Sequence, residues 1–183
     1  MQKATYIITP EFLKLMREDT DAIDWDAVSR LYVLSESLIT EFCDELNWIY
    51  LSEYQVLSES LIESFYDIVH WGWISAYQVL SEEFIRKNDY KLHWEKISAF
   101  QKLSESFIRE FEDSVDWYYI STYQDVSEEF LIEFSDRGLN WYHLFNNRDL
   151  SVEFLAKCSN FSQYMVSDIA FENIKKLRNI IKN

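Results

Sequence analysis

The sequence predicts an all-α fold: an α-solenoid of six 23-residue two-helix repeats with N- and C-terminal caps. Tryptophan recurs at a spacing of 23 residues, and of 24 at the last step: Trp25, Trp48, Trp71, Trp94, Trp117 and Trp141. Only 2 Gly and 1 Pro occur in 183 residues, whereas all-β folds and phosphate-binding loops usually need more of both. We expect one repeat domain, with a cap at 1–23, six repeats at 24–159 and a capping helix at 160–183.

Each repeat begins with a predicted helix that starts at the tryptophan. Apolar residues follow at every third position, as in Trp48, Leu51 and Tyr54, and this spacing places them on one helical stripe. The residue before the tryptophan is suited to accept hydrogen bonds from the first N–H groups of the helix. These predicted N-caps are Asp24, Asn47, His70, His93, Asp116 and Asn140.

The second helix of each repeat is predicted to open at a recurring serine, which acts as another N-cap. These serines are Ser35, Ser58, Ser81, Ser104, Ser127 and Ser151. Apolar residues follow in an i, i+1, i+4 pattern, as in Leu61, Ile62 and Phe65, which is typical of an amphipathic helix. Helices of about eight residues are too short to be stable alone, so stacking on neighbouring repeats must stabilise them.

The two ends differ from the repeats, as the ends of a solenoid should. Near the N-terminus, Thr9 and Pro10 predict the N-cap and first turn of a helix. Near the C-terminus, residues from about 167 to 182 predict a longer amphipathic helix. Its apolar side consists of Ala170, Ile174, Leu177 and Ile181. We interpret this helix as a cap, and a helix that lies on a membrane surface is the alternative.

Two repeats depart from the pattern. Asn88 stands where four of the other repeats have Phe, and 146–148 replaces the recurring Tyr-Gln pair. Such departures indicate either sequence drift or a functional surface.

The motif DWxxISxYQxLSExFIxEF, best seen in 116–134, resembles tandem repeats in proteins of bacteriophages and large DNA viruses. Its clearest parts here are Asp116-Trp117, Ile120-Ser121, Tyr123-Gln124, Ser127-Glu128 and Glu133-Phe134. The resemblance covers about 25–158 and implies a viral or mobile-element origin. It implies no activity.

The sequence predicts no enzyme, no metal site and no cofactor. His70 and His93 are one repeat apart, which places them about 10 Å apart in a helical stack, too far to share a metal ion. His143 stands alone. Cys43 and Cys158 are isolated within apolar helical patterns, so we expect two buried thiols and no disulfide. Nucleotide-binding motifs need glycines that the chain lacks.

Charge points to a protein partner. The chain has 17 Lys+Arg against 32 Asp+Glu, a net charge of −15, which repels nucleic acid and anionic membrane and attracts basic protein surfaces. We expect a partner with a basic surface, no direct contact with nucleic acid or membrane, and a cytoplasmic location, in the host cell if the protein is viral. The alternative is that acidity only keeps an aromatic-rich chain soluble.

Five glutamates recur at the first position of the second helix. They are Glu36, Glu59, Glu82, Glu105 and Glu128. A row stepping about 10 Å per repeat matches about three base steps of a nucleic-acid strand. This favours an inhibitor that imitates nucleic acid and blocks a host defence protein, for example a CRISPR effector. The simpler interpretation is that each glutamate only complements a helix dipole.

An adaptor is the alternative function. Other α-solenoids grip a peptide or helix in a groove, and exposed aromatic residues are the usual centres of binding energy. The candidates are Trp73, Tyr118 and Tyr119.

Overall fold

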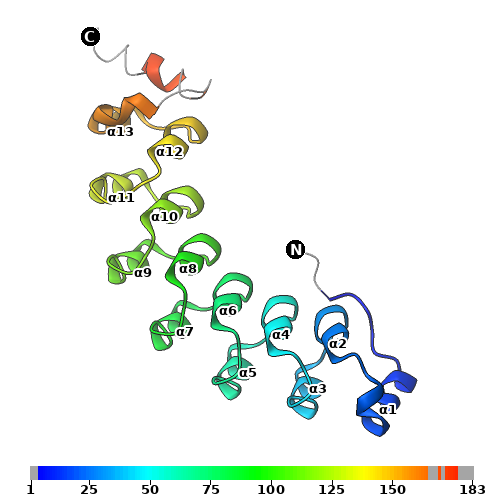
Figure 1. Ribbon diagram of the computed structural model, residues 1–183. Helices are drawn as coiled ribbons and strands as arrows, with labels where there is room; N and C mark the ends of the chain where they lie inside the picture. The colour runs from blue at the N-terminus through cyan, green and yellow to red at the C-terminus, as the bar shows by residue number, and fades with distance from the viewer. Residues whose placement is uncertain (1–3, 165–168, 170–171, 177–183) are drawn as a thin grey trace. The chain divides into compact units, whose positions relative to one another are not determined.

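The computed structural model describes residues 4–164, 169 and 172–176, and it is helical through most of that range (Figure 1). The chain divides into two compact units, unit 1 (Met1–His93) and unit 2 (Trp94–Asn183). Within each unit, helix pairs follow one another, with the first helices in one row and the second helices in another (Figure 1). The predicted α-solenoid of two-helix repeats is therefore confirmed.

Unit 1 holds the N-terminal helix and three repeats. Its elements are α1 (Pro10–Glu18), the 3-10 helix η1 (Thr20–Ala22), α2 (Trp25–Leu31), α3 (Glu36–Glu41), α4 (Trp48–Tyr54), α5 (Glu59–Ser64), α6 (Trp71–Tyr77) and α7 (Glu82–Lys87). Here α2, α4 and α6 are first helices, α3, α5 and α7 are second helices, and α4 packs against both α2 and α6.

Unit 2 holds the other three repeats. Its elements are α8 (Trp94–Phe100), α9 (Glu105–Glu110), α10 (Trp117–Tyr123), α11 (Glu128–Glu133), α12 (Trp141–Asn147), α13 (Val152–Lys157) and the 3-10 helix η2 (Ser159–Tyr164). The first helix α10 packs against α8 and α12, and the second helix α11 packs against α13.

The predicted capping residues start these helices. The Oδ1 atom of Asn47 accepts hydrogen bonds from the N–H groups of Ile49 and Tyr50. The imidazole Nδ1 of His70 accepts one from Trp73 at 3.2 Å, so a histidine does serve in this position. Side-chain caps are also formed by Thr9, Asp24, Asp116, Asn140 and all six recurring serines.

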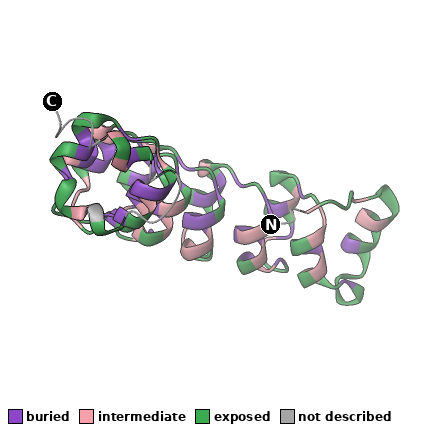
Figure 2. Ribbon diagram, turned by 90° about the horizontal axis from the view of Figure 1, so that it is seen from above, coloured by how far each residue is buried: buried purple, intermediate pink, exposed green. Residues whose placement is uncertain are grey.

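The recurring tryptophan fills the space between the two helices of its repeat. The ring of Trp48 lies 4.5 Å from that of Phe65, and the ring of Trp117 lies 4.4 Å from that of Phe134, measured between centroids. The indole N–H of Trp48 donates to the Cys43 carbonyl, so the polar edge of the ring is satisfied. Figure 2 shows the buried residues on the sides of the helices that face their neighbours.

Within each unit, buried glutamines join one repeat to the repeat before it. The Nε2 of Gln55 donates to the carbonyls of Ser29 and Tyr32, at 2.9 and 2.7 Å, and its Oε1 accepts from the Leu34 N–H at 3.1 Å. Gln78 and Gln124 repeat this arrangement within their own units. A helix leaves its last carbonyls unpaired, and the glutamine of the next repeat satisfies two carbonyls at this end.

A buried serine makes a second polar link. The Oγ of Ser52 donates to the Trp48 carbonyl at 2.7 Å and accepts from the N–H of His70, the N-cap of the next repeat, at 3.0 Å. Ser29, Ser75, Ser98 and Ser121 accept in the same way from the N-cap of the following repeat. Each of these serines directly follows an apolar residue of the stripe predicted from the sequence, but the part of the serines in joining repeats was not predicted.

In the sixth repeat another residue keeps the glutamine link, and in the third repeat the irregular residue is buried within its own helix. Arg148, in place of glutamine, donates to the Gln124 carbonyl at 2.8 Å. Asn88, in place of Phe, is buried and donates to the Phe84 carbonyl. Asn173 donates to the carbonyls of Phe145 and Arg148 and so takes the place of the next glutamine. The sequence departures at these positions are therefore part of the scaffold.

The C-terminal cap is described in part. It begins with η2, where the ring of Phe161 stacks on that of Trp141 at 4.0 Å, and residues 172–176 are helical. Ile174, on the predicted apolar side, is half-buried, while Ala170, Leu177 and Ile181 lie outside the described residues. Cys43 and Cys158 are free thiols, as predicted, although Cys43 is only half-buried.

Candidate functional site: two surfaces built on the repeats

Most glutamates of the predicted row form hydrogen bonds to the next repeat. The Glu36 carboxylate accepts a hydrogen bond from the N–H of Ser58, the N-cap serine of the next repeat, at 3.0 Å. Glu59, Glu105 and Glu128 accept in the same way from Ser81, Ser127 and Ser151. Glu82, the remaining member, starts α7 and is half-buried. These side chains therefore link successive second helices, which is a structural role beyond the dipole effect.

These hydrogen bonds favour the ionised form of Glu36 and Glu105. Bonds donated by the Ser58 side chain and backbone lower the pKa of Glu36. The Ser127 N–H lowers the pKa of Glu105 in the same way, with smaller help from Arg109. A hydrogen bond to the charged form of a carboxylate favours that form. Glu36 and Glu105 thus stay negatively charged while they bond to the next repeat.

Other carboxylates of the second helices pair with basic residues of a neighbouring helix. Arg17 of α1 binds Glu41 of α3 with two hydrogen bonds, of 2.7 and 2.9 Å. Lys87 pairs with Glu63 at 2.6 Å, and Arg109 pairs with Glu133 at 2.8 Å. These pairs are solvent-exposed, and pairs of this kind contribute little to stability.

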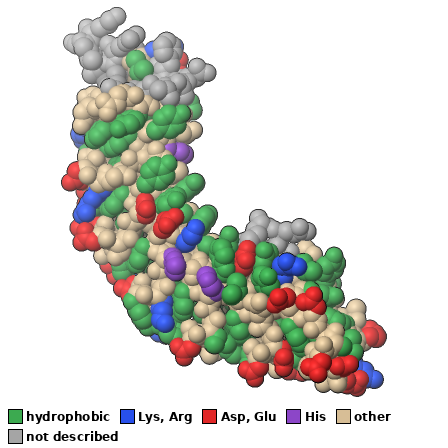
Figure 3. All heavy atoms as spheres, viewed as in Figure 1, with side chains coloured by type: hydrophobic (Ala, Val, Ile, Leu, Met, Phe, Trp, Pro, Cys, Tyr) green, Lys and Arg blue, Asp and Glu red, His purple; other side chains and the backbone are tan. Residues whose placement is uncertain are grey.

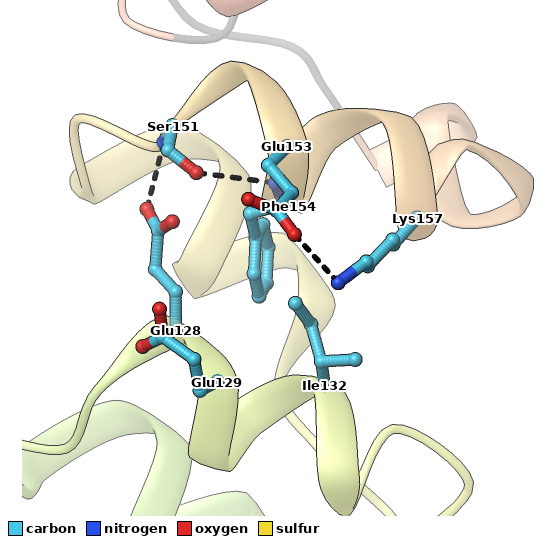
Figure 4. Close-up of a pocket in the computed structure, with 7 residues that line it drawn as sticks. All are labelled: Glu128, Glu129, Ile132, Ser151, Glu153, Phe154 and Lys157. Atoms are coloured by element: carbon cyan, nitrogen blue, oxygen red, sulfur yellow. Dashed lines mark hydrogen bonds and ion pairs between the residues drawn. The ribbon is translucent and has the colours of Figure 1, made fainter.

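A small pocket lies where such a pair is replaced. Ile132 of α11 stands at the position that Arg109 has in the previous repeat, so Lys157 bonds Glu153 of its own helix at 2.7 Å (Figure 4). The pocket has a volume of about 120 Å³ and is lined by Glu128, Glu129, Ile132, Ser151, Glu153, Phe154 and Lys157. Figure 4 shows Phe154 and Ile132 between α11 and α13, with Glu128 and Glu129 on one side of them and Lys157 on the other. The pocket is too small for more than a side-chain tip.

Aromatic side chains cover the first helices of both units. In unit 1 they are Tyr50, Tyr54, Trp73 and Tyr77, on α4 and α6. In unit 2 they are Phe100, Tyr118, Tyr119, Tyr123 and Tyr142, on α8, α10 and α12. We call these sets the aromatic faces of unit 1 and unit 2. Figure 3 shows hydrophobic side chains gathered over the first helices and acidic ones mainly along the second helices.

The three predicted aromatic residues lie on these faces. Trp73 is half-buried, and its ring stacks on that of Tyr77 at 5.5 Å. Tyr118 is 52% exposed. Tyr119 is half-buried, stacks on Tyr123 at 6.0 Å, and donates its hydroxyl proton to Glu95 at 3.3 Å. The nearby Glu95 charge raises the pKa of Tyr119, with burial second. Trp73 therefore belongs to a different unit from the two tyrosines.

Cations of the chain itself already lie over rings of these faces. The Arg30 guanidinium lies 5.6 Å from the centre of the Tyr50 ring, and the Lys96 ammonium lies 5.9 Å from that of Phe100. Both distances fall within the range of a cation–π contact. Carboxylates also stand on the first helices, at Asp26, Glu53 and Glu95. The faces thus combine exposed π-systems with negative charge.

The histidines lie closer together than the sequence predicted. A Cβ atom placed on Gly72 would meet the Cε1 atoms of both His70 and His93, at 3.1 and 3.5 Å. The two rings therefore share the small space above Gly72, and the predicted separation of about 10 Å was wrong. The prediction considered the helix spacing alone and ignored the space that a glycine leaves for both rings. Among the described residues, no group of three or more His, Cys, Asp or Glu could hold a metal ion.

His143 lies apart in unit 2. Its imidazole is half-buried, and burial together with the neighbouring positive charge of Arg148 lowers its pKa. Its Nδ1 lies 3.5 Å from the side-chain nitrogen of Asn147, on its own helix.

Comparison with known protein families, with curated proteins and with solved structures found no match to this chain. Across the part of the chain that the structure describes, no helix has the length and apolar character needed to cross a membrane.

Proposed function

We propose that this protein is a non-catalytic binding solenoid that grips a basic segment of a partner protein on its aromatic faces. The observation that carries the proposal is that the polar and the aromatic residues of the repeat have different environments. The recurring polar residues, glutamine, serine and glutamate, are bonded to neighbouring repeats. Several aromatic residues of the first helices remain in contact with solvent, with Phe100 at 59% exposure and Tyr123 at 62%.

The chemistry of the faces favours arginine and lysine in the partner. A guanidinium stacks on tyrosine and tryptophan rings and forms bidentate pairs with carboxylates. The faces offer both groups, for example Tyr50 next to Glu53 on α4 and Tyr119 bonded to Glu95. The net charge of −15 attracts such a partner at long range.

A second candidate keeps the same basic partner but uses the second helices. There the protein imitates nucleic acid and inhibits a host nucleic-acid-binding protein in the cytoplasm, in keeping with the resemblance to viral repeats. The observation in its favour is that Glu36 and Glu105 remain charged, because their pKa values are lowered, while they form regular links between repeats. Exposed carboxylates such as Glu83 and Glu129 add to the charge of these helices.

Affinity capture from the lysate of the natural host separates the two candidates. The baits are the wild-type chain, an aromatic variant (Trp73→Ala, Tyr118→Ala, Tyr123→Ala) and a charge variant (Glu83→Gln, Glu129→Gln). Binding by the aromatic faces predicts a partner that the charge variant retains and that the aromatic variant loses. Part of the binding should persist at about 0.5 M salt, where charge effects extend only a few ångströms.

Mimicry predicts the reverse pattern. The partner would be released by salt, displaced by duplex DNA or RNA, and lost with the charge variant. A partner held equally by both variants would contradict both candidates. Far-UV circular dichroism of each bait checks that the substitutions leave the helices intact.

A further inference from the structure

The N-terminal segment of the chain is bound to the first repeat as an extended strand. The N–H groups of Thr5 and Tyr6 both donate to the Leu31 carbonyl at 2.9 Å, and the Val33 N–H donates to the Tyr6 carbonyl at 2.8 Å. Tyr6 and Tyr32 form a parallel bridge. The segment therefore pairs with the residues that leave the C-terminus of α2, where a helix has carbonyls without helical partners.

Backbone hydrogen bonds provide most of this contact. Tyr6 remains 57% exposed and Ile7 81% exposed, so neither side chain is enclosed. The Tyr6 ring touches that of Tyr32 at 5.6 Å between centroids. Pairing that depends on the backbone depends little on the sequence of the segment, which is how strand addition to an exposed edge works.

The same edge recurs in the next two repeats of unit 1. The residues after α4 and α6 carry a valine where the first repeat has Val33: Val56 is 69% exposed and Val79 is 92% exposed. Among the described residues, no hydrogen-bond partner is recorded for the N–H groups of these two valines or for the carbonyls of Tyr54 and Tyr77. We call the stretches 54–56 and 77–79 the valine edges. Each offers the acceptor and the donor that Leu31 and Val33 offer in the first repeat.

The equivalent stretches of unit 2 are charged. Lys102, Asp125 and Asp149 stand where unit 1 has valine, and Asp149 is paired with Lys176. Charged side chains on an edge discourage the addition of another strand, and natural proteins use them for this purpose. The exposed valines of unit 1 therefore permit an added strand, whereas the charged residues of unit 2 disfavour one.

We propose that each valine edge binds an extended segment of a partner protein, parallel to the edge, as the N-terminal segment binds the first repeat. The segment donates an N–H to the carbonyl of Tyr54 or Tyr77 and accepts from the N–H of Val56 or Val79. At these edges the residue equivalent to Tyr32 is an inward-facing glutamine. An aromatic or β-branched side chain of the segment therefore lies against the tyrosine and valine instead.

The valine edge at 54–56 prefers a segment without acidic residues. Glu53 precedes Tyr54 in α4, and its charge contributes, after burial, to the raised pKa of the Tyr54 hydroxyl. A carboxylate in the segment would meet this negative charge. The valine edges share Tyr54 and Tyr77 with the aromatic face of unit 1, but their hydrogen-bonding groups are separate from it.

The test uses the full chain and a capped peptide with the sequence of residues 4–9, Ala-Thr-Tyr-Ile-Ile-Thr. Peptide titration is followed by amide chemical shifts in two-dimensional NMR. Saturable shifts are expected at Val56 and Val79, with none at Lys102 or Asp125. An absence of saturable shifts at millimolar peptide, or saturable shifts centred on other residues, overturns the proposal.

Proline variants test the mechanism. Val56→Pro and Val79→Pro remove the donor N–H, and proline is tolerated because the preceding glutamines are extended, with ψ of 162° and 152°. Each should weaken binding at its own edge about tenfold. Asp125→Pro follows an equally extended Gln124 and is the matched control, expected to change nothing.

Binding that survives in the Val56→Pro, Val79→Pro double variant would overturn the proposal. An aromatic variant, Trp73→Ala, separates it from the function proposed above. Loss of partner capture in that variant together with intact peptide shifts at the valines shows that the two surfaces act independently. Loss of the peptide shifts in that variant, with the helices intact, contradicts the assignment to the valine edges.

Discussion

Unit 1 and unit 2 use the same links between repeats and differ in what they expose beside those links. Gln55 in unit 1 and Gln124 in unit 2 bond the carbonyls of the preceding repeat in the same way. The residue directly after them is Val56 in one case and Asp125 in the other. The buried and exposed positions of the repeat have therefore diverged independently. Repeats with one scaffold can then carry different surfaces.

The largest effect is expected from breaking the shared link. Gln124→Leu leaves the Leu103 N–H and the carbonyls of Ser98 and Gln101 without their buried partner, and each unsatisfied group costs about 1–3 kcal/mol. We expect the free energy of unfolding in urea to fall by about 3 kcal/mol, and Gln55→Leu should act alike in unit 1. Tyr123→Leu, an exposed neighbour, is the control and should change it by less than about 0.5 kcal/mol. Near-equal values for Gln124→Leu and Tyr123→Leu would contradict the assigned role.

An intermediate effect is expected from acid. The pKa values of Glu36 in unit 1 and Glu105 in unit 2 lie below the ordinary 4.5 because serine groups of the next repeat donate to them. The stabilisation is thus complete above about pH 4.5 and is lost as the pH falls through the lowered pKa values. Glu36→Gln and Glu105→Gln keep an acceptor oxygen and do not titrate. Thermal melting between about pH 6 and 3 should therefore depend less on pH in both variants than in wild type.

The control for the acid series is Glu129→Gln, which removes the same charge at an exposed position next to Glu128. It should follow the wild-type pH dependence. If it flattens the curve as much as Glu105→Gln does, general charge repulsion and not the glutamate–serine bond sets the acid response.

The smallest effect on stability is expected from exchanging the edges. Val79 is 92% exposed, so Val79→Lys should change the free energy of unfolding by less than about 0.5 kcal/mol, and Asp125→Val should do the same. Their effects on peptide binding should be opposite. Val79→Lys should remove the amide shifts at its edge, and Asp125→Val should produce shifts in unit 2. Unchanged peptide binding in both variants would show that charge does not distinguish the two units.

The scaffold could be predicted from the sequence because it recurs. Trp48, Ser58 and their equivalents identify helix starts by periodicity and capping chemistry alone. The recurring Gln55 and Ser52 were visible too, but a single sequence does not say where a polar side chain finds its partner. Their hydrogen bonds cross from one repeat to the next, over 26 and 18 residues.

The candidate surfaces were harder to predict. Trp73 and Tyr118 were identified as candidates because exposed aromatic residues often carry binding energy, and both lie on the first helices. The glutamates were expected to imitate nucleic acid or to complement helix dipoles, and the bond from Ser58 to Glu36 was not predicted. The valine edges were missed because Val56 looks like an ordinary spacer until the docked N-terminal segment shows what the equivalent Val33 does.

The glutamine link has a consequence for how such proteins change over generations. Each described side-chain hydrogen bond of Gln55, Gln78 and Gln124 reaches only the immediately preceding repeat. In-frame recombination that copies or removes one whole block would leave the remaining junctions complete. A lineage could in this way lengthen or shorten the array, and rearrange the surfaces it displays, without first losing the ability to fold.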